Sequence, residues 1–187
     1  RDPVRPLVFA SFGTLQGHRL RLFRKIAADC RLVGADCVVA HCGRLDGRSA
    51  ARIGADIVTD FVPQRAMLSR AAVCVTHAGM NTVLDALRAG KPLLAIPIAF
   101  DQPGIASRIV HHGVGSKLAR VLLSRRKLGR ALEALLCEDS YSQAAGKMAG
   151  AVRAGGGAAV AADIAEAGVS TASRRTSQET DLEGLVA

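Results

Sequence analysis

Short, almost wholly apolar runs that alternate with longer amphipathic stretches limit most strongly how this chain can fold. The apolar runs cover residues 7–10, 37–40, 57–61, 73–75 and 93–96. Apolar side chains recur at helical spacing in the intervening and following stretches, over residues 18–34, 64–70, 80–89 and 102–112. Strands that are apolar throughout are typical of a parallel sheet, because helices bury both of its faces. The alternation therefore predicts an α/β fold with right-handed crossovers.

The pattern becomes helical after Gly115, over residues 124–136, 141–154 and 158–167. Ser124 and Ser140 are suited to cap helices, because a serine hydroxyl accepts from the free N–H groups of a first turn. From Ser170 the chain is rich in Ser, Thr, Arg, Gln and Glu without periodicity, which is typical of a flexible tail. We expect one domain over residues 1–169, a tail over residues 170–187 and no second domain.

The composition is that of a globular protein, with 187 residues of which 49% are apolar and 22% charged. No apolar run approaches the roughly 20 residues that a membrane-spanning helix needs. The chain begins with Arg1 and carries no signal peptide, so we expect a piece of a longer protein whose N-terminal part is missing. Five cysteines without a paired Cys-x-x-Cys spacing argue against a zinc site and a disulfide framework. They indicate the cytoplasm, with Cys37 and Cys74 in the core.

The net charge is +9, and arginine supplies most of it. A GC-rich genome explains such an excess, and so does an anionic partner. Nucleic acid is the weaker choice, because one Tyr, five Phe and no Trp leave few side chains for stacking on bases. Residues 107–132 hold seven Lys or Arg and no acid. This stretch is either a solvated helix face or a contact with anionic lipid.

Polar and small residues follow two of the predicted strands, where a parallel sheet binds its ligands. After the first strand, Gly13 allows a close backbone approach, and the hydroxyls of Ser11 and Thr14 can donate to phosphate oxygens. After the strand that ends near residue 96, Asp101 and Gln102 offer acceptors and donors for sugar hydroxyls. Asp101 can equally cap the helix that follows it.

The loop Thr-His-Ala-Gly-Met-Asn-Thr over residues 76–82 is the strongest candidate site. It leaves a strand and enters a helix, so free backbone N–H groups and the helix dipole favour an anion there. His77, Asn81 and Thr82 add side-chain donors, and a charge-assisted bond from His77 to a phosphate contributes roughly 1.5–3 kcal/mol. Asp85, one turn further on, can accept from a sugar diol. The alternative is that Asn81 or Thr82 only caps the helix.

In order and spacing these residues resemble the signature of the UDP-glycosyltransferases of the GT-B fold. That signature runs from aromatic-x-Pro-Gln through His-x-Gly-x-Asn-Ser/Thr-x-x-Glu to Asp-Gln. Here its pieces are residues 61–64, 77–85 and 101–102, and the similarity covers residues 6–168. It implies the C-terminal, Rossmann-like half of such an enzyme, which binds the sugar donor. Plant members carry Trp at the positions of Phe61 and Met80, and Glu at that of Asp85.

The resemblance implies roles for the matched positions. Phe61 would stack on the uracil ring, the Val62 backbone would read its edge, and Asp85 would bind the ribose with Gln64 nearby. Thr14, His77, Asn81 and Thr82 would hold the diphosphate, and Asp101 with Gln102 would hold the transferred sugar. The whole implied donor-binding set is Ser11, Gly13, Thr14, Phe61, Val62, Gln64, His77, Gly79, Met80, Asn81, Thr82, Asp85, Asp101 and Gln102.

The family mechanism implies transfer with inversion, in which a histidine base lies in the N-terminal domain. This half would then hold no catalytic residue, and His77 would stabilise the departing diphosphate. The resemblance implies no cofactor and no metal, since the UDP-sugar is a co-substrate. The chain alone would bind the sugar donor with little or no activity.

Within the family, residues 9–19, 77–86 and 99–104 resemble the bacterial zeaxanthin glucosyltransferases, which glucosylate the ring hydroxyls of a carotenoid diol. A small lipophilic acceptor of this kind implies a cytoplasmic enzyme that touches the membrane peripherally. Two alternatives stay open: the donor-binding subunit of a two-chain glycosyltransferase, and a basic nucleic-acid-binding module that only the charge supports.

Overall fold

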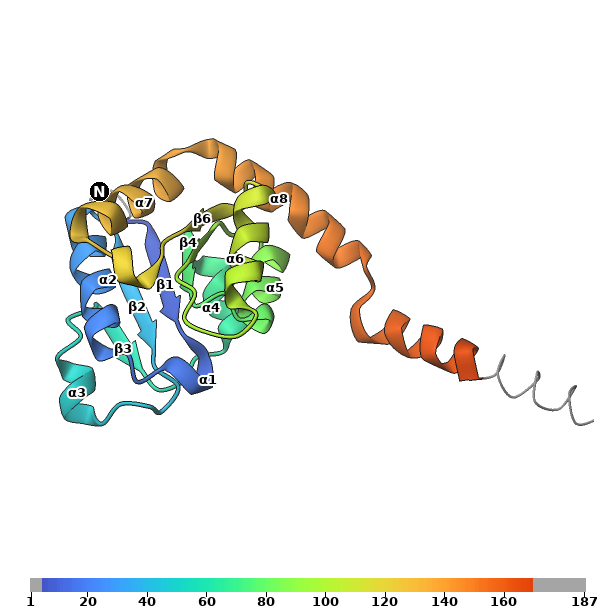
Figure 1. The fold of residues 1–187 in the computed structure, drawn as a ribbon, viewed down its shortest axis with the longest axis horizontal. Coiled ribbons are helices and arrows are strands. Elements are labelled where there is room, and N and C mark those ends of the chain that lie inside the picture. The colour runs from blue at the N-terminus through green and yellow to red at the C-terminus, as the bar shows by residue number, and fades with distance from the viewer. Residues whose placement is uncertain (1–4, 170–187) are drawn as a thin grey trace, which may run out of the picture. The chain divides into compact units, whose positions relative to one another are not determined.

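The computed structural model describes residues 5–169, whose six parallel strands form one sheet in the order β3-β2-β1-β4-β5-β6 (Figure 1). The strands are β1 (Leu7–Ser11), β2 (Asp36–Ala40), β3 (Ile57–Thr59), β4 (Val73–Thr76), β5 (Leu93–Ala95) and β6 (Gly115–Lys117). From β1 the chain adds β2 and β3 on one side, and it then returns to place β4 on the other side of β1. The strand order therefore reverses between β1 and β4. A doubly wound sheet binds its ligand at that point. The predicted α/β fold is confirmed.

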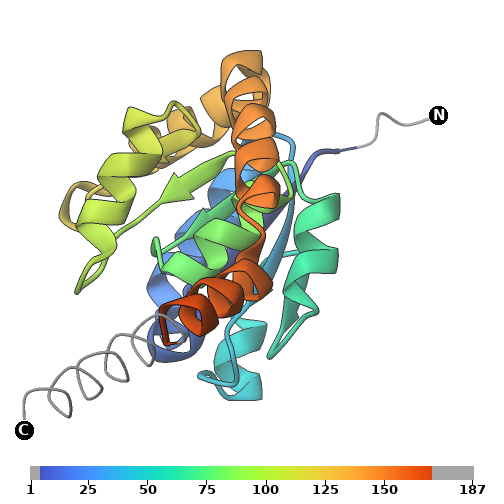
Figure 2. The same ribbon diagram turned by 90° about the vertical axis from the view of Figure 1, so that its right-hand side faces the viewer.

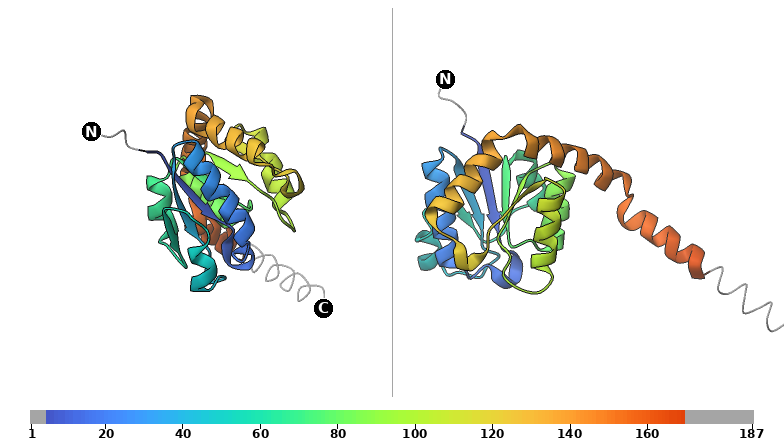
Figure 3. Two further views of the ribbon diagram at one scale, coloured as in Figure 1. Left: turned by 90° about the vertical axis from the view of Figure 1, so that its left-hand side faces the viewer. Right: turned by 45° about the horizontal axis from the view of Figure 1, so that its top comes forward.

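Helices cover both faces of the sheet. The helices up to residue 154 are α1 (Gly13–Gln16), α2 (Leu20–Leu32), α3 (Gly47–Ala51), α4 (Gln64–Arg70), α5 (Met80–Arg88), α6 (Gln102–His111), the 3₁₀ turn η1 (Arg120–Leu122), α7 (Arg125–Cys137) and α8 (Asp139–Ala154). α2 packs against α7 (Figure 1), and α4 packs against α5 (Figure 2). The left panel of Figure 3 shows the sheet between α2, in blue, and α4, in teal.

The core lies between the sheet and the pair α2 and α7. Phe23 and Ile26 of α2 are fully buried together with Leu128 and Leu132 of α7. Their spacing of three or four residues places them on one stripe of each helix. Each such side chain contributes roughly 1.5–3 kcal/mol on burial, so this stripe fixes α2, and with it the loop that follows β1.

The sequence predictions after Gly115 need two corrections. The stretch begins with the edge strand β6, where a Cβ on Gly115 would lie 2.0 Å from the Leu93 carbonyl oxygen. Glycine is needed for this close packing although it is rare in strands, which is why the pattern concealed the strand. Ser124 caps α7 as predicted, accepting from the Lys127 N–H, whereas Ser140 lies inside α8, which begins at Asp139.

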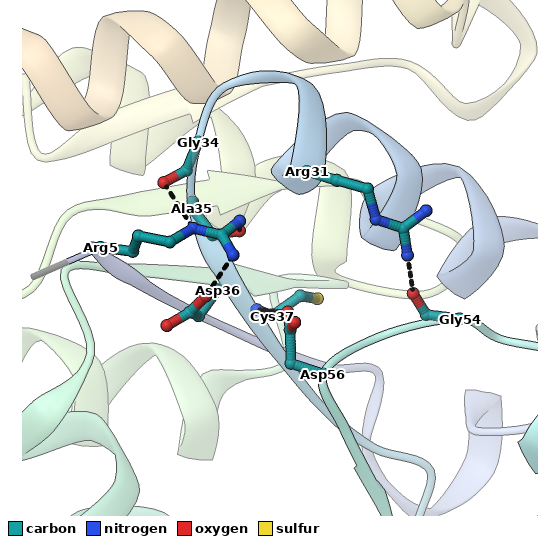
Figure 4. A network of polar contacts seen from close by, with 8 residues as sticks. All are labelled: Arg5, Arg31, Gly34, Ala35, Asp36, Cys37, Gly54 and Asp56. Carbon is teal, nitrogen blue, oxygen red and sulfur yellow. Dashed lines mark hydrogen bonds and ion pairs between the residues drawn. The ribbon is translucent and has the colours of Figure 1, made fainter. Parts of the chain in front are cut away.

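Polar contacts brace the amino ends of the strands (Figure 4). The Arg5 guanidinium lies 2.9 Å from Asp36 Oδ1 and donates to the Ala35 carbonyl at 2.9 Å. The Cys37 N–H donates to Asp56 Oδ2 at 2.8 Å, which ties the start of β2 to the residue before β3. These contacts are structural, and they lie at the end of the sheet opposite to the carboxyl ends.

Among the described residues, 5–150 form one compact unit, and a second unit begins at residue 151. The described part of the second, residues 151–169, contains a helix over 157–169 that includes the predicted one. The predicted tail lies outside the described residues. No helix within residues 5–169 is both long enough and apolar enough to cross a membrane.

Candidate functional site

A cleft of about 500 Å³ opens at the carboxyl ends of the central strands, beside the point where the strand order reverses. Every residue of the implied donor-binding set lines it except Asp85 and Asp101. The structure also adds residues that the sequence did not single out: Phe9, Leu15, Gln16, Ala40, Cys42, Asp60 and Phe100. Segments far apart in the sequence thus meet in a single cleft.

Three residues around this end of the sheet have left-handed backbone conformations that only glycine adopts freely. They are Cys42 after β2, Ala78 after β4 and Phe100 after β5, with φ angles of 56°, 66° and 58°. Each costs of order 1–3 kcal/mol, and such conformations cluster at functional sites. The backbone strain therefore supports a functional role for this cleft.

Two glycines make room for the His77 ring. A Cβ on Gly13 would lie 3.1 Å from the ring carbon Cε1, and one on Gly79 would lie 2.6 Å from Nε2. The ring also stands edge-on to Phe12, at 6.5 Å between ring centroids. Any larger residue at position 79 would displace the imidazole from the N-terminus of α5.

The protonation state of His77 follows from its burial. Desolvation lowers the pKa of His77, and the charge of Asp101 opposes this only in part. The buried Nδ1 has no hydrogen-bond partner among the described residues. The imidazole alone is therefore neutral at pH 7, and the charge-assisted bond expected from the sequence requires that the imidazole take up a proton when an anionic ligand binds.

The N-terminus of α5 provides backbone donors at the same place. Gly79 occupies the N-cap position, no side chain caps the helix, and Val83 N–H donates to the Gly79 carbonyl at 3.1 Å. The first-turn N–H groups of a helix have no partner inside it and favour an anion. The alternative that Asn81 or Thr82 caps this helix is wrong, because both lie within its first turn.

A polar network links α4 to α5 next to the cleft. Gln64 donates from its amide to Asp85 Oδ2 at 2.8 Å and accepts from the Thr82 hydroxyl at 3.3 Å. The Arg65 guanidinium lies 3.0 Å from Asp85 Oδ1. Asp85 does not itself line the cleft, but its carboxylate holds Gln64, which does. Arg65 was missed by the sequence analysis, although it directly follows a motif residue.

Gln102 and Asp101 differ in how far they are free to bind a ligand. The buried Gln102 accepts at Oε1 from the N–H groups of Ile98 and Ala99, at 2.8 and 2.9 Å. Its carbonyl oxygen thus fixes the loop, and its amide nitrogen is left to serve a ligand. Asp101 occupies the N-cap position of α6 but makes no capping hydrogen bond, so the alternative of a side-chain cap is wrong.

A buried histidine positions the loop that carries Phe61. His41 follows β2, is 2% exposed, and places Nε2 2.9 Å from Asp60 Oδ1, while Nδ1 accepts from the Leu45 N–H at 3.2 Å. Nδ1 is an acceptor here, so Nε2 carries the proton. Phe61 itself is 66% exposed at the cleft, which leaves its ring free to stack on a planar ligand.

Metal-binding groups are not gathered at this site. Within residues 5–169, no cluster of three or more His, Cys, Asp or Glu side chains could hold a metal ion. The polar groups that line the cleft near the α5 N-terminus are backbone N–H groups, hydroxyls, an amide and an imidazole.

A parallel sheet in this order, with a cleft where the order reverses, defines a Rossmann-like ligand-binding domain. Comparison with known proteins gives the family: residues 8–151 match the model of the UDP-glucoronosyl and UDP-glucosyl transferases, and the chain belongs to that family. The resemblance found in the sequence is confirmed.

Relatives and solved structures agree with this assignment. The zeaxanthin glucosyltransferase of Pantoea ananas is 47% identical over 165 residues, covering 87% of this chain and 38% of that protein. That of Pseudescherichia vulneris is 45% identical over 141 residues, covering 74% and 34%. The crystal structure of the calicheamicin glycosyltransferase CalG4 superposes with a TM-score of 0.77 at 28% identity, covering 89% and 44%. The chain thus spans less than half the length of these proteins.

Proposed function

We propose that this chain is the donor-binding half of an inverting glucosyltransferase that moves glucose from UDP-glucose to a hydroxyl group of zeaxanthin. The observation that carries the proposal is the convergence at one cleft of His77, the α5 N-terminus and Gln64, which Asp85 holds from outside the lining. The names of the two relatives above support the sugar and the acceptor.

The cleft and the residues Asp85 and Asp101 beside it offer a partner for each part of a UDP-sugar. Phe61 stacks on the uracil, next to the Val62 backbone. Asp85 and Gln64 take the ribose hydroxyls, which a carboxylate and an amide can bind together. The α5 N-terminus, His77 and Thr14 take the diphosphate. Asp101 and the amide nitrogen of Gln102 hold the glucose.

The proposed reaction is a single displacement. The acceptor oxygen attacks the anomeric carbon, the bond from that carbon to the diphosphate oxygen breaks, and UDP leaves. A base from an N-terminal half takes the acceptor proton. In this chain the helix N-terminus and His77 stabilise the charge that develops on the diphosphate. His77 does so more strongly when its imidazole is protonated. We propose that no metal or cofactor takes part.

We also propose that the enzyme is cytoplasmic and acts at the membrane surface. Zeaxanthin dissolves in lipid, whereas UDP-glucose dissolves in water, so the two substrates meet at the interface.

A transfer assay tests the proposal. The full-length protein, given UDP-glucose and zeaxanthin in vesicles, should form the mono- and diglucosides, and the present chain alone should form neither. Asp101→Ala should lower the rate by at least about tenfold, because a charge-assisted hydrogen bond to the sugar is lost, whereas Asp139→Ala on α8 should not. UDP release with other acceptors but not with zeaxanthin would contradict zeaxanthin as the acceptor. No UDP release with any acceptor would contradict the proposed glucosyl transfer itself.

A further inference from the structure

A second cavity, of about 580 Å³, lies between the start of α2 and the segment 120–123. It is lined by His18, Arg19, Leu20, Arg21, Leu22, Lys25, Arg120 and Leu123. Five of these residues are basic, three are leucines and none is acidic. No residue of this set belongs to the donor cleft described above.

Two of the cations are fixed in place. Lys25 Nζ donates to the Leu123 carbonyl at 3.1 Å, which ties α2 to the segment after η1. The Arg19 guanidinium donates twice to Gln16 Oε1, at 3.0 and 2.9 Å. The cavity therefore has cationic walls that its own hydrogen bonds hold in position.

Two further cations are free to bind a ligand. Arg21 and Arg120 are exposed, and neither forms an ion pair or a side-chain hydrogen bond within the part of the chain that the structure describes. Arg21 and Lys25 are four residues apart on α2 and share one face of it. Arg120 approaches from η1, so cations line the cavity on both sides.

The charge at the start of α2 is unfavourable without a partner. Arg19 stands at the N-cap position, the first turn contains no acidic residue, and no side chain caps the helix. A helix N-terminus is the positive end of its dipole and normally attracts acidic side chains. The acidic residue of α2 is Asp29, and it faces Arg125 rather than the cations at the start of the helix. Departures from local preference of this kind are expected at functional sites.

The apolar side chains show what kind of anion fits. Leu20, Leu22 and Leu123 line the same cavity as the cations, and Val121, next to Arg120, is 85% exposed. Leu22 and Leu123 belong to the buried core, so the accessible apolar surface comes from the partly buried Leu20 and from Val121. A small inorganic anion would leave these two side chains in water, whereas an amphiphile would cover them. We propose that this cavity binds the phosphate of an anionic phospholipid, with the adjoining acyl chain along Leu20 and Val121. The inference rests on the proposed action at the membrane and names the surface that makes the contact.

Vesicle co-sedimentation tests the inference. The 187-residue chain is mixed with phosphatidylcholine vesicles, with or without phosphatidylglycerol, and should bind only the anionic ones. Arg21→Gln with Arg120→Gln should weaken this binding about 30-fold, since each cation near an anionic surface contributes about 1 kcal/mol. Arg48→Gln with Arg70→Gln, on exposed positions of α3 and α4, removes the same charge and should weaken it less than about threefold. Val121→Ser should weaken it by about threefold or more without changing the charge.

Three results would overturn the inference. Equal losses in the two double variants would mean general charge attraction and no site. Glycerol phosphate that binds the wild type as tightly as vesicles do would mean a site for small anions. If the sample binds UDP but no anionic vesicles, the proposed lipid-binding surface is contradicted while the proposed donor site stands. A sample that binds anionic vesicles but no UDP would instead contradict the proposed function alone.

Discussion

Gln64 donates a hydrogen bond of 2.8 Å to Asp85 Oδ2 and so joins α4 to α5 beside the cleft. Asp85 also lies 3.0 Å from Arg65, so its carboxylate is held by two partners before any ligand arrives. A group already fixed in position loses little entropy when it binds a ribose. The pair is thus prepared for the diol of a nucleotide.

Asp85→Ala should weaken UDP binding roughly 10- to 100-fold, because a carboxylate–hydroxyl bond is charge-assisted. The affinity for pyrophosphate, which has no ribose, should change little. Arg65→Gln is the control, since it keeps the carboxylate. Titration calorimetry with both ligands checks this, and an equal loss for UDP and pyrophosphate would place Asp85 outside ribose recognition.

Gly79→Ala should weaken UDP binding about tenfold or more while the protein stays folded. The new Cβ would lie 2.6 Å from His77 Nε2, so the imidazole must leave its place at the α5 N-terminus. Gly104→Ala is the matched control, because a Cβ there meets nothing within 4 Å. If both variants bind UDP like the wild type, the position of His77 does not matter for binding.

The stability of the protein should fall below pH 6.5 in a way that depends on His77. Burial lowers the pKa of His77 in the folded state beneath the ordinary histidine value of 6.5. As the pH falls through 6.5, the unfolded chain takes up a proton before the folded one does, so the free energy of unfolding decreases. His77→Gln should remove this slope. Urea unfolding at pH 8, 7, 6 and 5 measures it, and parallel curves for the two proteins would contradict the assignment.

Asp29 should give a slope of opposite sign. Burial raises its pKa above 3.8, against the charge of Arg125, whose Nε lies 3.7 Å from Oδ1. Neither carboxylate oxygen has a hydrogen-bond partner within the described residues. Its contribution to stability is therefore present below pH 3.8 and is lost as the pH rises through the folded-state pKa.

Asp29→Asn should accordingly be stabilised relative to the wild type more at pH 7 than at pH 3.5. The difference in unfolding free energy between the two proteins should be about 1 kcal/mol more favourable to the variant at pH 7. Urea unfolding of both proteins at pH 3.5, 5 and 7 checks this. A difference that stays constant over this range would show that the carboxyl group ionises freely.

Most of the fold followed from local patterns, and the exceptions have physical reasons. β1 to β5 are apolar runs and were predicted within two residues. β6 has the sequence Gly-Ser-Lys, and only its close packing on β5 makes it a strand. α3 was also missed, because its five residues carry no apolar period. Its one local signal is Asp46, whose carboxylate accepts from the Ser49 N–H at 2.7 Å.

The candidate site divides in the same way. His77, Asn81 and Thr82 are close in sequence and could be predicted together from one loop. The contact of His41 with Asp60 depends on the parallel pairing of β2 with β3, which residue types alone do not specify. Asp101 was placed correctly at the start of α6, but its side chain does not cap that helix.

Titration calorimetry of this chain with UDP, UDP-glucose and TDP, repeated on His77→Ala, tests the central claim most directly. We predict micromolar to millimolar binding of UDP and UDP-glucose that weakens at least about tenfold in the variant, because the phosphate loses its imidazole partner. UDP binding of the same strength in the wild type and in His77→Ala would contradict the account.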